Sequence, residues 1–328
     1  MTKTTAKKRI ISTCSIILIL LLLIGVVLIY YFGKRYDFYN YSTAEVQIPG
    51  LQDGFIPQGL CNIDNTNGYL ISGYMKDSQK NSRIYYVNKD GTCKYITIDT
   101  LDTNLNKGHF GGVAMYENMV WLVSDGYLFN FSLENIVNAE NSTTITAISI
   151  FNTQINTDFC YAKDGLLYIG EFYKAKKYEV DKAHYVKISD TEINHGITLC
   201  YNIDTNKENG LASTKPIKAI SVPDQAQGMC ITDSGKYVIS TSYSLPDSQI
   251  YVYSTPEIAK NKITINGDEL DLFVLSNDIL EKNIVAPCMS EGIDYENGRV
   301  HILFENACKK YKFFTRVREK NIQSVEVK

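Results

Sequence analysis

Residues 291–305 read Glu-Gly-Ile-Asp-Tyr-Glu-Asn-Gly-Arg-Val-His-Ile-Leu-Phe-Glu. A polar residue and a glycine open an apolar strand, a turn follows near Asn297 and Gly298, and a second apolar strand ends at Glu305. The same order of features, with glycine in most copies, recurs in four other segments: 58–74, 109–125, 158–171 and 227–243. Such recurrence is typical of repeat architectures, in which each unit buries its faces against its neighbours.

Additional strands follow several of these hairpins. Residues 83–87 and 249–253 are the expected third strands, and residues 94–98 and 270–275 the expected fourth strands. Four strands per unit are typical of a propeller blade. We therefore predict an all-β chain that forms a single β-propeller of five blades. A sixth, weakly marked blade within 172–222 or 243–286 is the alternative.

The last repeat ends before it has four strands. Residues 44–48 read Ala-Glu-Val-Gln-Ile and can supply its outer strand. This pairing would close the ring and remove an exposed sheet edge.

Residues 10–32 are free of charge, and residues 16–24 are entirely Ile and Leu. At 1.5 Å per residue, a helix of this length spans a hydrocarbon core of roughly 30 Å. We expect an uncleaved transmembrane helix. The alternative is a cleaved signal peptide, but this requires an A-x-A-like cleavage site, and none follows the apolar run. The aromatic residues at its end form an expected interfacial belt: Tyr30, Tyr31, Phe32 and Tyr36.

Four basic residues precede this span and two follow it, so the N-terminus should remain cytoplasmic. The expected organisation is a basic tail at 1–9, a membrane helix at 10–32, a tether at 33–43 and an extracytoplasmic propeller at 44–328. Residues 36–328 carry 27 Lys and Arg against 36 Asp and Glu, a net charge of about −9. A domain with this charge is a poor partner for nucleic acid.

Blade topology predicts which residues meet. The first strand of each blade starts at the face where the second strand ends, so the residues at these positions should share one rim. The predicted ligand-binding rim consists of Gln58, His109, Asp125, Asp158, Glu171, Gln227, Tyr243, Glu291 and Glu305, with Tyr74 beside them.

Five of these rim residues are acids, which repel one another unless a cation or an Arg lies between them. Oxygen ligands suit Ca²⁺ or another divalent cation, and Glu291 and Glu305 are the candidate ligands. The alternative is structural, because turn carboxylates commonly accept backbone N–H bonds.

The stretch 172–197 leaves from the same rim as an insertion. Long insertions of this kind are often functional, and this one is a candidate lid; a plain solvated loop is the alternative. Its three lysines, Lys174, Lys176 and Lys177, would face the acidic rim or an anionic ligand. Among the four histidines, His109 is the functional candidate, and His301 is expected to be structural.

Three short motifs carry a family resemblance: 56–59 (Ile-Pro-Gln-Gly), 108–112 (Gly-His-Phe-Gly-Gly) and 290–293 (Ser-Glu-Gly-Ile). Over about residues 44–315 the chain resembles the lactonase, gluconolactonase, NHL and phytase-like propellers and uncharacterised secreted bacterial relatives. The resemblance implies the propeller fold. Enzymes among these relatives often bind a divalent cation over the central channel, but the spacing of their ligands is missing here.

The expected function is that of a membrane-anchored, extracytoplasmic binding module of the cell envelope, with a small molecule, a glycan or a protein as its ligand. A divalent-metal-dependent hydrolase or lactonase with its site at the channel mouth is the alternative. A purely structural envelope protein is a third interpretation. The seven cysteines after residue 32 lie mostly in apolar strands, so we expect small buried thiols.

Overall fold

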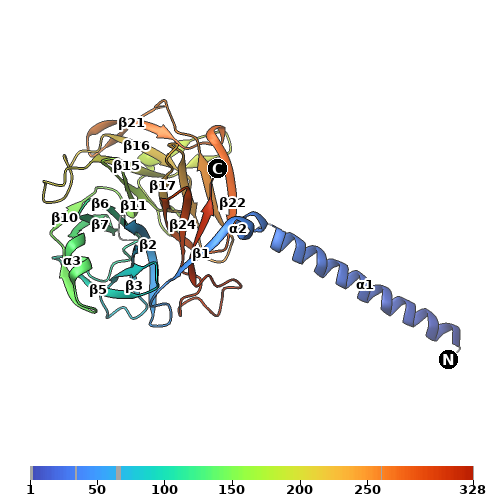
Figure 1. The fold of residues 1–328 in the computed structure, drawn as a ribbon. Coiled ribbons are helices and arrows are strands. Elements are labelled where there is room, and N and C mark those ends of the chain that lie inside the picture. Colours follow the sequence, from blue (N-terminus) through green and yellow to red (C-terminus); the bar gives the residue numbers. More distant parts are fainter. Residues whose placement is uncertain (1–2, 34, 64–67, 260, 328) are drawn as a thin grey trace.

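The computed structural model describes residues 3–33, 35–63, 68–259 and 261–327, with side chains except at residues 3–12, 29–33 and 36. Within them, five sheets are arranged around a central axis (Figure 1). This confirms the five-bladed propeller. The alternative of a sixth blade is wrong, because the strands within 172–222 and 243–286 join blades three and four, apart from one short two-stranded hairpin at 186–194.

Each blade runs from an inner strand at the central axis to outer strands at the circumference of the propeller. Blade one consists of β2 (Phe55–Ile63), β3 (Gly68–Met75), β4 (Arg83–Asn88) and β5 (Cys93–Asp99). Blade two consists of β6 (Gly112–Tyr116), β7 (Met119–Ser124), β8 (Tyr127–Ser132) and β10 (Ser149–Asn152). Blade three consists of β11 (Thr157–Lys163), β12 (Leu166–Glu171), β15 (Gly196–Asn202) and β16 (Lys218–Val222).

The last two blades bring distant parts of the chain together. Blade four consists of β17 (Ala226–Ile231), β18 (Tyr237–Thr241), β19 (Ser248–Tyr253) and β22 (Leu280–Ala286). Blade five consists of β23 (Ser290–Glu296), β24 (Arg299–Phe304), β25 (Asn321–Glu326) and β1 (Ser42–Gln47). The chain therefore begins and ends its propeller in the same sheet.

The predicted ring closure is confirmed. Strand β1 pairs antiparallel with β25, with Ala44 opposite Gln323. Arg299 of β24 ties the strands together, because its guanidinium donates to Thr43 Oγ1 at 3.1 Å and to the Ser324 carbonyl at 2.8 Å. The third strand of this blade, β25, lies in a charged segment whose sequence gives no clear strand pattern.

The prediction that 270–275 is the fourth strand of blade four is wrong. That stretch belongs to β21 (Asp268–Val274), which pairs parallel with β16 of blade three and antiparallel with β20 (Asn261–Ile265). Strand β22 takes the fourth place instead. An edge strand shows the same alternation of apolar residues whichever sheet it joins, so the pattern alone does not choose between two neighbouring blades.

The remaining elements are short. Strand β9 (Thr144–Thr146) pairs parallel with β5, and α3 (Leu133–Asn138) precedes it. The insertion after β12 contains the 3₁₀ turn η1 (Lys182–His184) and the hairpin of β13 (Val186–Lys187) and β14 (Ile193–Asn194). A second 3₁₀ turn, η2 (Asn277–Ile279), precedes β22.

The apolar core lies between neighbouring blades. Leu70 of blade one and Leu122 of blade two share one buried cluster, while Val123 of blade two and Ile169 of blade three share the next. The eight cysteines are free thiols, and six of the seven after residue 32 are buried as predicted, whereas Cys93 is exposed. Burial of these faces requires neighbouring blades, so no blade is stable alone.

Near the axis the inner strands approach backbone to backbone, and glycine permits this. A Cβ atom at Gly59 would lie 2.6 Å from the Val113 amide nitrogen of the next blade. A Cβ atom at Gly292 would lie 2.5 Å from the Leu60 amide nitrogen. The glycine that follows the polar residue in these repeats is therefore a packing requirement of the ring.

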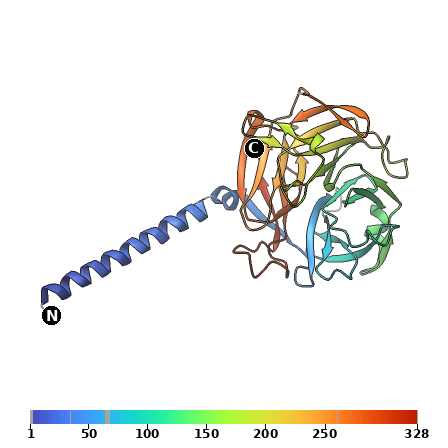
Figure 2. The same ribbon diagram turned by 180° about the vertical axis from the view of Figure 1, so that it is seen from behind.

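At the N-terminus, α1 (Lys3–Gly33) extends away from the propeller (Figure 2). Its described side chains cover residues 13–28, and most of these are exposed. Among the described residues, no helix combines the length and apolar character needed to cross a membrane. The predicted span at 10–32 and the predicted aromatic belt extend beyond the described side chains.

The segment expected as a tether packs against the propeller. It contains α2 (Tyr36–Tyr41), whose Phe38 is buried and meets Phe304 edge to face, with ring centroids 6.0 Å apart. Arg35 is buried and forms an ion pair with Asp247 of the β18–β19 connection. These contacts fix the start of the propeller domain relative to blades four and five.

Candidate functional site

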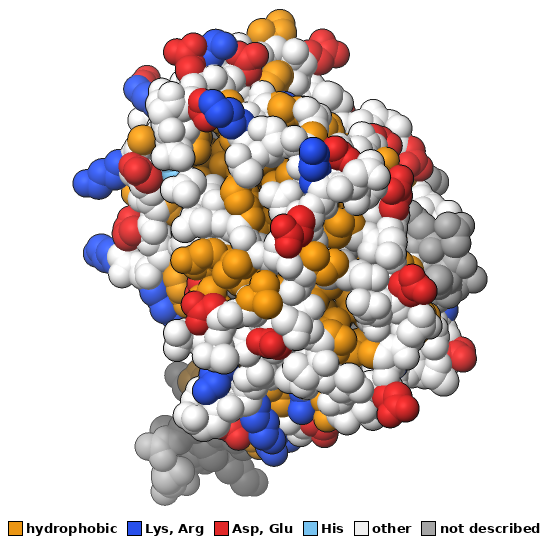
Figure 3. Space-filling view, turned by 90° about the vertical axis from the view of Figure 1, so that its left-hand side faces the viewer, with side chains coloured by type: hydrophobic (Ala, Val, Ile, Leu, Met, Phe, Trp, Pro, Cys, Tyr) orange, Lys and Arg blue, Asp and Glu red, His pale blue; other side chains and the backbone are white. Residues whose placement is uncertain are grey.

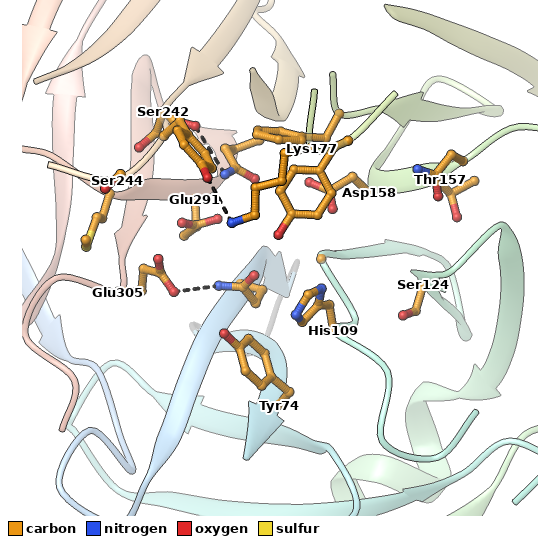
Figure 4. A pocket seen from close by; sticks show the side chains of 18 of the residues that line it. Tyr74, His109, Ser124, Thr157, Asp158, Lys177, Ser242, Ser244, Glu291 and Glu305 are labelled. Carbon is orange, nitrogen blue, oxygen red and sulfur yellow. Dashed lines mark hydrogen bonds between the residues drawn. The ribbon is translucent and has the colours of Figure 1, made fainter. Parts of the chain in front are cut away.

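A cavity of about 470 Å³ opens at one end of the central channel (Figure 4). Of the nine predicted rim residues, it brings together eight: Gln58, His109, Asp125, Asp158, Gln227, Tyr243, Glu291 and Glu305. Tyr74 lines it as well. Residues from all five blades therefore converge on one space, as the blade topology predicts.

Irregular pairing turns the inner-strand residues toward this cavity. The register of the first two strands shifts at the position of Gln58 in blade one, Asp158 in blade three and Gln227 in blade four. Glu291 lies in the corresponding shift of blade five. A β-bulge of this kind adds one residue to a strand and re-aims its side chain. Four β-bulges therefore each direct one polar side chain into the same cavity.

The second strands of the blades deliver the other carboxylates. Glu305 directly follows β24, and Asp125 directly follows β7 in a left-handed conformation with φ of 52°. Ser124 holds Asp125 in place, because its hydroxyl donates to Asp125 Oδ2 at 2.6 Å.

Glu291 and Glu305 form a hydrogen-bonded pair of buried carboxyl groups. Burial, followed by the charge of Glu305, raises the pKa of Glu291 well above its ordinary value. Burial also raises the pKa of Glu305, to about 7. Their shared hydrogen bond raises the pKa of Glu291 and lowers that of Glu305, which is the pattern expected when a protonated Glu291 donates to Glu305.

Two glutamine amides lie between the acids. Gln58 Nε2 donates to Glu305 Oε2 at 3.1 Å (Figure 4). With its amide nitrogen turned toward the acids, Gln227 donates to Asp158 Oδ2 at 3.0 Å and to Glu291 Oε2 at 3.2 Å. Burial, and then the charge of Asp125, raises the pKa of Asp158 to about 7. The repulsion among the acids is therefore relieved by protons and amide donors.

His109 adds a neutral imidazole to this wall. Burial lowers its pKa below the ordinary value, although the charge of Asp125 opposes the shift. Its ring packs on Tyr74, with centroids 4.6 Å apart. A histidine in this state offers one donor and one acceptor at neutral pH.

Cations and aromatic rings also line the cavity. Lys177 of the insertion donates to the Tyr243 hydroxyl at 2.9 Å, and Lys310 donates to the Tyr74 hydroxyl at 2.6 Å (Figure 4 shows the first bond). The Lys310 ammonium also lies 4.8 Å from the Tyr311 ring centroid. Each lysine is thus held at the cavity by a tyrosine.

The insertion contributes part of the cavity lining. Phe172, Lys177 and Tyr178 of the insertion line the cavity, whereas Lys174 lies over the Tyr243 ring at 5.0 Å. The Lys176 amide bonds to Glu179 within the insertion itself. Of the three lysines expected to face the rim, only Lys177 belongs to the cavity lining.

Glu171 is the predicted rim residue that lies outside this cavity lining. It is buried, with His184 Nδ1 at 3.0 Å from its Oε2, and it accepts the Ile197 amide at 3.2 Å. Because blade three carries the insertion, its second strand ends in contacts that fasten the insertion to the sheet. His301 is likewise buried, with the Tyr69 hydroxyl at 3.1 Å, as expected for a structural histidine.

The expected metal ligands, Glu291 and Glu305, share a hydrogen bond, and each also accepts from a glutamine: Gln227 donates to Glu291 and Gln58 to Glu305. In the described part of the chain, no group of three or more His, Cys, Asp or Glu side chains is arranged to hold a metal ion. The amide donors beside these acids suit a proton-sharing pair better than a divalent cation, which needs several further oxygen ligands.

Sequence reasoning missed several lining residues, chiefly Lys310, Tyr311, Tyr178, Ser242 and Ser244. Lys310 and Tyr311 follow Glu305 in a segment that has no repeat pattern, so nothing in the sequence aligned them with the rim. The serines lie within three residues of the end of β18, so extending the end of each second strand by a few residues would have included them.

Chemically, the cavity combines planar hydrogen-bonding groups with aromatic faces. It presents four carboxyl groups, two Gln amides, a neutral imidazole and two lysine ammonium groups. Such a site can form many hydrogen bonds with a polar ligand. The Glu291–Glu305 pair can in addition give and take one proton near neutral pH.

No protein-family model and no curated protein matches the chain. Among solved structures it is similar to glutaminyl cyclase from Myxococcus xanthus, with 9% identity, a TM-score of 0.45, and 88% of this chain and 95% of that chain covered. It is also similar to the PQQ-bound aldose sugar dehydrogenase from Streptomyces coelicolor, with 9% identity, a TM-score of 0.44 and coverage of 86% and 95%. A third is BamB from Moraxella catarrhalis, with 7% identity, a TM-score of 0.34 and coverage of 83% and 85%. The five sheets described above, rather than these similarities, define the chain as a β-propeller.

Proposed function

We propose that this chain is a membrane-anchored, extracytoplasmic propeller that binds a hydroxyl-rich ligand of the cell envelope, of the glycan class, in its channel-mouth cavity. Carboxylates and amides accept and donate hydrogen bonds to hydroxyl groups in the plane of the side chain, and tyrosine rings offer an apolar face. Four carboxyl groups, two Gln amides and Tyr74 meet these needs within one space.

One observation carries the proposal. Buried carboxyl groups destabilise a fold unless they are paired, yet blades one, three, four and five each distort an inner strand where a polar side chain enters this cavity. A purely structural role would be served by an apolar channel. The arrangement is therefore best understood as a preformed polar binding site.

Calorimetric titration of the detergent-solubilised full chain with soluble cell-wall glycan fragments tests the proposal. Glu291→Gln should weaken binding by about tenfold, equivalent to about 1.4 kcal/mol. Glu140→Gln is the matched control, because Glu140 is exposed and outside the cavity lining. Equal affinity of the two variants, or no heat of binding with any fragment, would exclude the glycan site.

The anchoring part of the proposal rests on the sequence. Residues 10–32 have no charged residue, four basic residues precede them, and a helix runs through them. A reporter fused after Lys328 should be active only outside the cytoplasm, and protease added to intact spheroplasts should digest residues 36–328. Full protection of the domain would disprove the topology.

A hydrolase is the second candidate, and the proton-sharing pair favours it. In this reaction Glu305 takes a proton from water as the water oxygen attacks the carbonyl carbon of an ester or lactone. Glu291 gives its proton to the departing alkoxide oxygen as the C–O bond breaks, and the proton on Glu305 returns through their hydrogen bond. Turnover of chromogenic esters or lactones that is lost in Glu291→Gln would support this reading. Parallel assays with added Ca²⁺ and with a chelator test whether a divalent cation takes part.

A further inference from the structure

The loop between β24 and β25 exposes two aromatic side chains. Phe313 is 80% exposed and Phe314 is 69% exposed, and both ribbon views show this dark red loop projecting from the propeller (Figures 1 and 2). Leu245, in the β18–β19 connection, is 49% exposed. Large apolar side chains that gather at a surface mark a place of contact with another apolar phase.

The same loop concentrates positive charge on an acidic domain. Residues 309–320 contain six Lys and Arg and a single acid, Glu319. Glu319 is buried and accepts a hydrogen bond from the Tyr39 hydroxyl at 2.9 Å, so it does not face the exposed phenylalanines. The face of the molecule on the left of Figure 1 instead intersperses acidic and basic side chains (Figure 3).

This surface adjoins the point where α1 meets the propeller. Phe314 and Arg316 line a small cavity of about 110 Å³ together with Leu245 and Arg35. Arg35 lies two residues beyond the end of α1 at Gly33 and is itself fixed to Asp247. Whatever surrounds the end of α1 therefore lies beside Phe314.

We propose that Phe313, Phe314 and Leu245, with the flanking Lys309, Lys312, Arg316 and Arg318, form a membrane-contact surface that inserts at the interface of a bilayer containing anionic lipids. Aromatic side chains partition to the level of the headgroups, and neighbouring Lys and Arg attract anionic lipid. The proposal rests on the proposed anchoring in one respect, since residues 10–32 would bring the bilayer to this side of the propeller.

Contact at this surface would also determine where the channel-mouth cavity opens relative to the membrane. Lys310 and Tyr311 line the channel-mouth cavity, and Phe313 follows only two residues later. Ser244 lines the same cavity beside Leu245. The cavity would then open next to the membrane surface, where it meets ligands carried by or growing from the envelope rather than ligands approaching from bulk solvent.

Tryptophan fluorescence in vesicles tests the proposal directly. The single native tryptophan, Trp121, is buried in blade two and donates to the Asn209 carbonyl at 3.0 Å, so lipid cannot reach it. The full chain carrying Phe314→Trp is reconstituted into vesicles of phosphatidylcholine and phosphatidylglycerol, with and without brominated acyl chains. Ile258→Trp, at a residue that is 78% exposed in the β19–β20 connection, is the matched control.

Brominated lipid should quench most of the added emission of F314W and leave that of I258W unchanged. In the F314W background, K312E with R318E should reduce this quenching, whereas K187E with K215E should not, because Lys187 and Lys215 lie outside the surface. Equal quenching of F314W and I258W would overturn the proposal. So would a blue-shifted F314W emission that brominated lipid does not quench, because that means a protein covers the surface.

Alkaline carbonate extraction of the same vesicles separates this surface from the anchor. Unquenched F314W in chain that resists extraction would mean that the anchor holds and the contact surface does not exist. Quenched F314W in chain that carbonate removes would mean that the surface contacts lipid while the transmembrane anchor fails.

Discussion

Glu291 and Glu305, which are 14 positions apart in one hairpin, share a hydrogen bond at the channel mouth while both are buried. Ser290 pairs with Phe304 at the base of this hairpin, and the β-bulge that follows turns Glu291 toward Glu305. Gln58 from blade one and Gln227 from blade four donate to the pair from either side. The pair is therefore assembled by three blades.

The first prediction concerns the donor of this pair. Glu291→Gln should leave the free energy of unfolding at pH 7 within about 0.5 kcal/mol of the wild type, because a Gln amide can donate to Glu305 as the protonated acid does. Glu291→Ala should lower it by about 2 kcal/mol, because the buried Glu305 keeps its bond from Gln58 but loses the donor at position 291. Urea denaturation of both variants measures the difference. Equal losses in the two would mean that Glu291 does not act as a donor.

The second prediction concerns pH. The pKa of Glu305 and that of Asp158 are each raised to about 7 from ordinary values of 4.5 and 3.8. As pH rises, the unfolded chain releases these protons first, so stability that is present below about pH 4 is lost progressively up to about pH 7. Within this window, each rise of one pH unit lowers the free energy of unfolding by about 1.4 kcal/mol for each proton that only the folded state retains.

Denaturation series from pH 4 to pH 8 should show this decline in the wild type and a shallower one in Glu305→Gln. The Gln variant has one titrating group fewer. Parallel slopes for the two proteins would show that Glu305 does not titrate in this window.

The third prediction concerns the close packing of inner strands. Gly292→Ala should lower the free energy of unfolding by about 1–3 kcal/mol, because its Cβ would lie 2.5 Å from the backbone of Leu60. The matched control is Gly196→Ala in β15, where the nearest atom to a new Cβ is 3.4 Å away. Thermal melts that rank the control as the more damaged protein would contradict backbone-to-backbone packing at the axis.

The fourth prediction concerns ring closure. Arg299→Ala removes the donor to Thr43, the Tyr41 carbonyl and Ser324, so β1 should detach more readily and the free energy of unfolding should fall by about 2 kcal/mol. Lys262 of the edge strand β20 forms an exposed ion pair with Asp271 of β21. Lys262→Ala breaks this pair and should lower the free energy of unfolding by less than about 1 kcal/mol. Hydrogen exchange of the β1 amides should accelerate in Arg299→Ala alone. Unchanged exchange there would show that Arg299 does not hold the ring closed.

The sequence by itself determined the five-bladed ring, because each blade repeats a local pattern: a polar residue, a strand, a turn and a second strand. It also determined the rim, since the direction of strands within a hairpin fixes which ends meet. Eight of the nine rim residues therefore line one cavity, and a strand that overlaps the predicted 44–48, β1 at Ser42–Gln47, pairs with the last blade.

Only the tertiary structure decided the rest. Whether β21 joins blade three or blade four depends on long-range pairing that local alternation does not encode. The place of Lys310 at the cavity depends on how a loop without a repeat pattern returns to the axis. Glu171 lies outside the cavity lining because it contacts His184 of the insertion instead. The proton shared by Glu291 and Glu305 depends on burial and on amides from other blades, which are properties of packing rather than of neighbouring sequence.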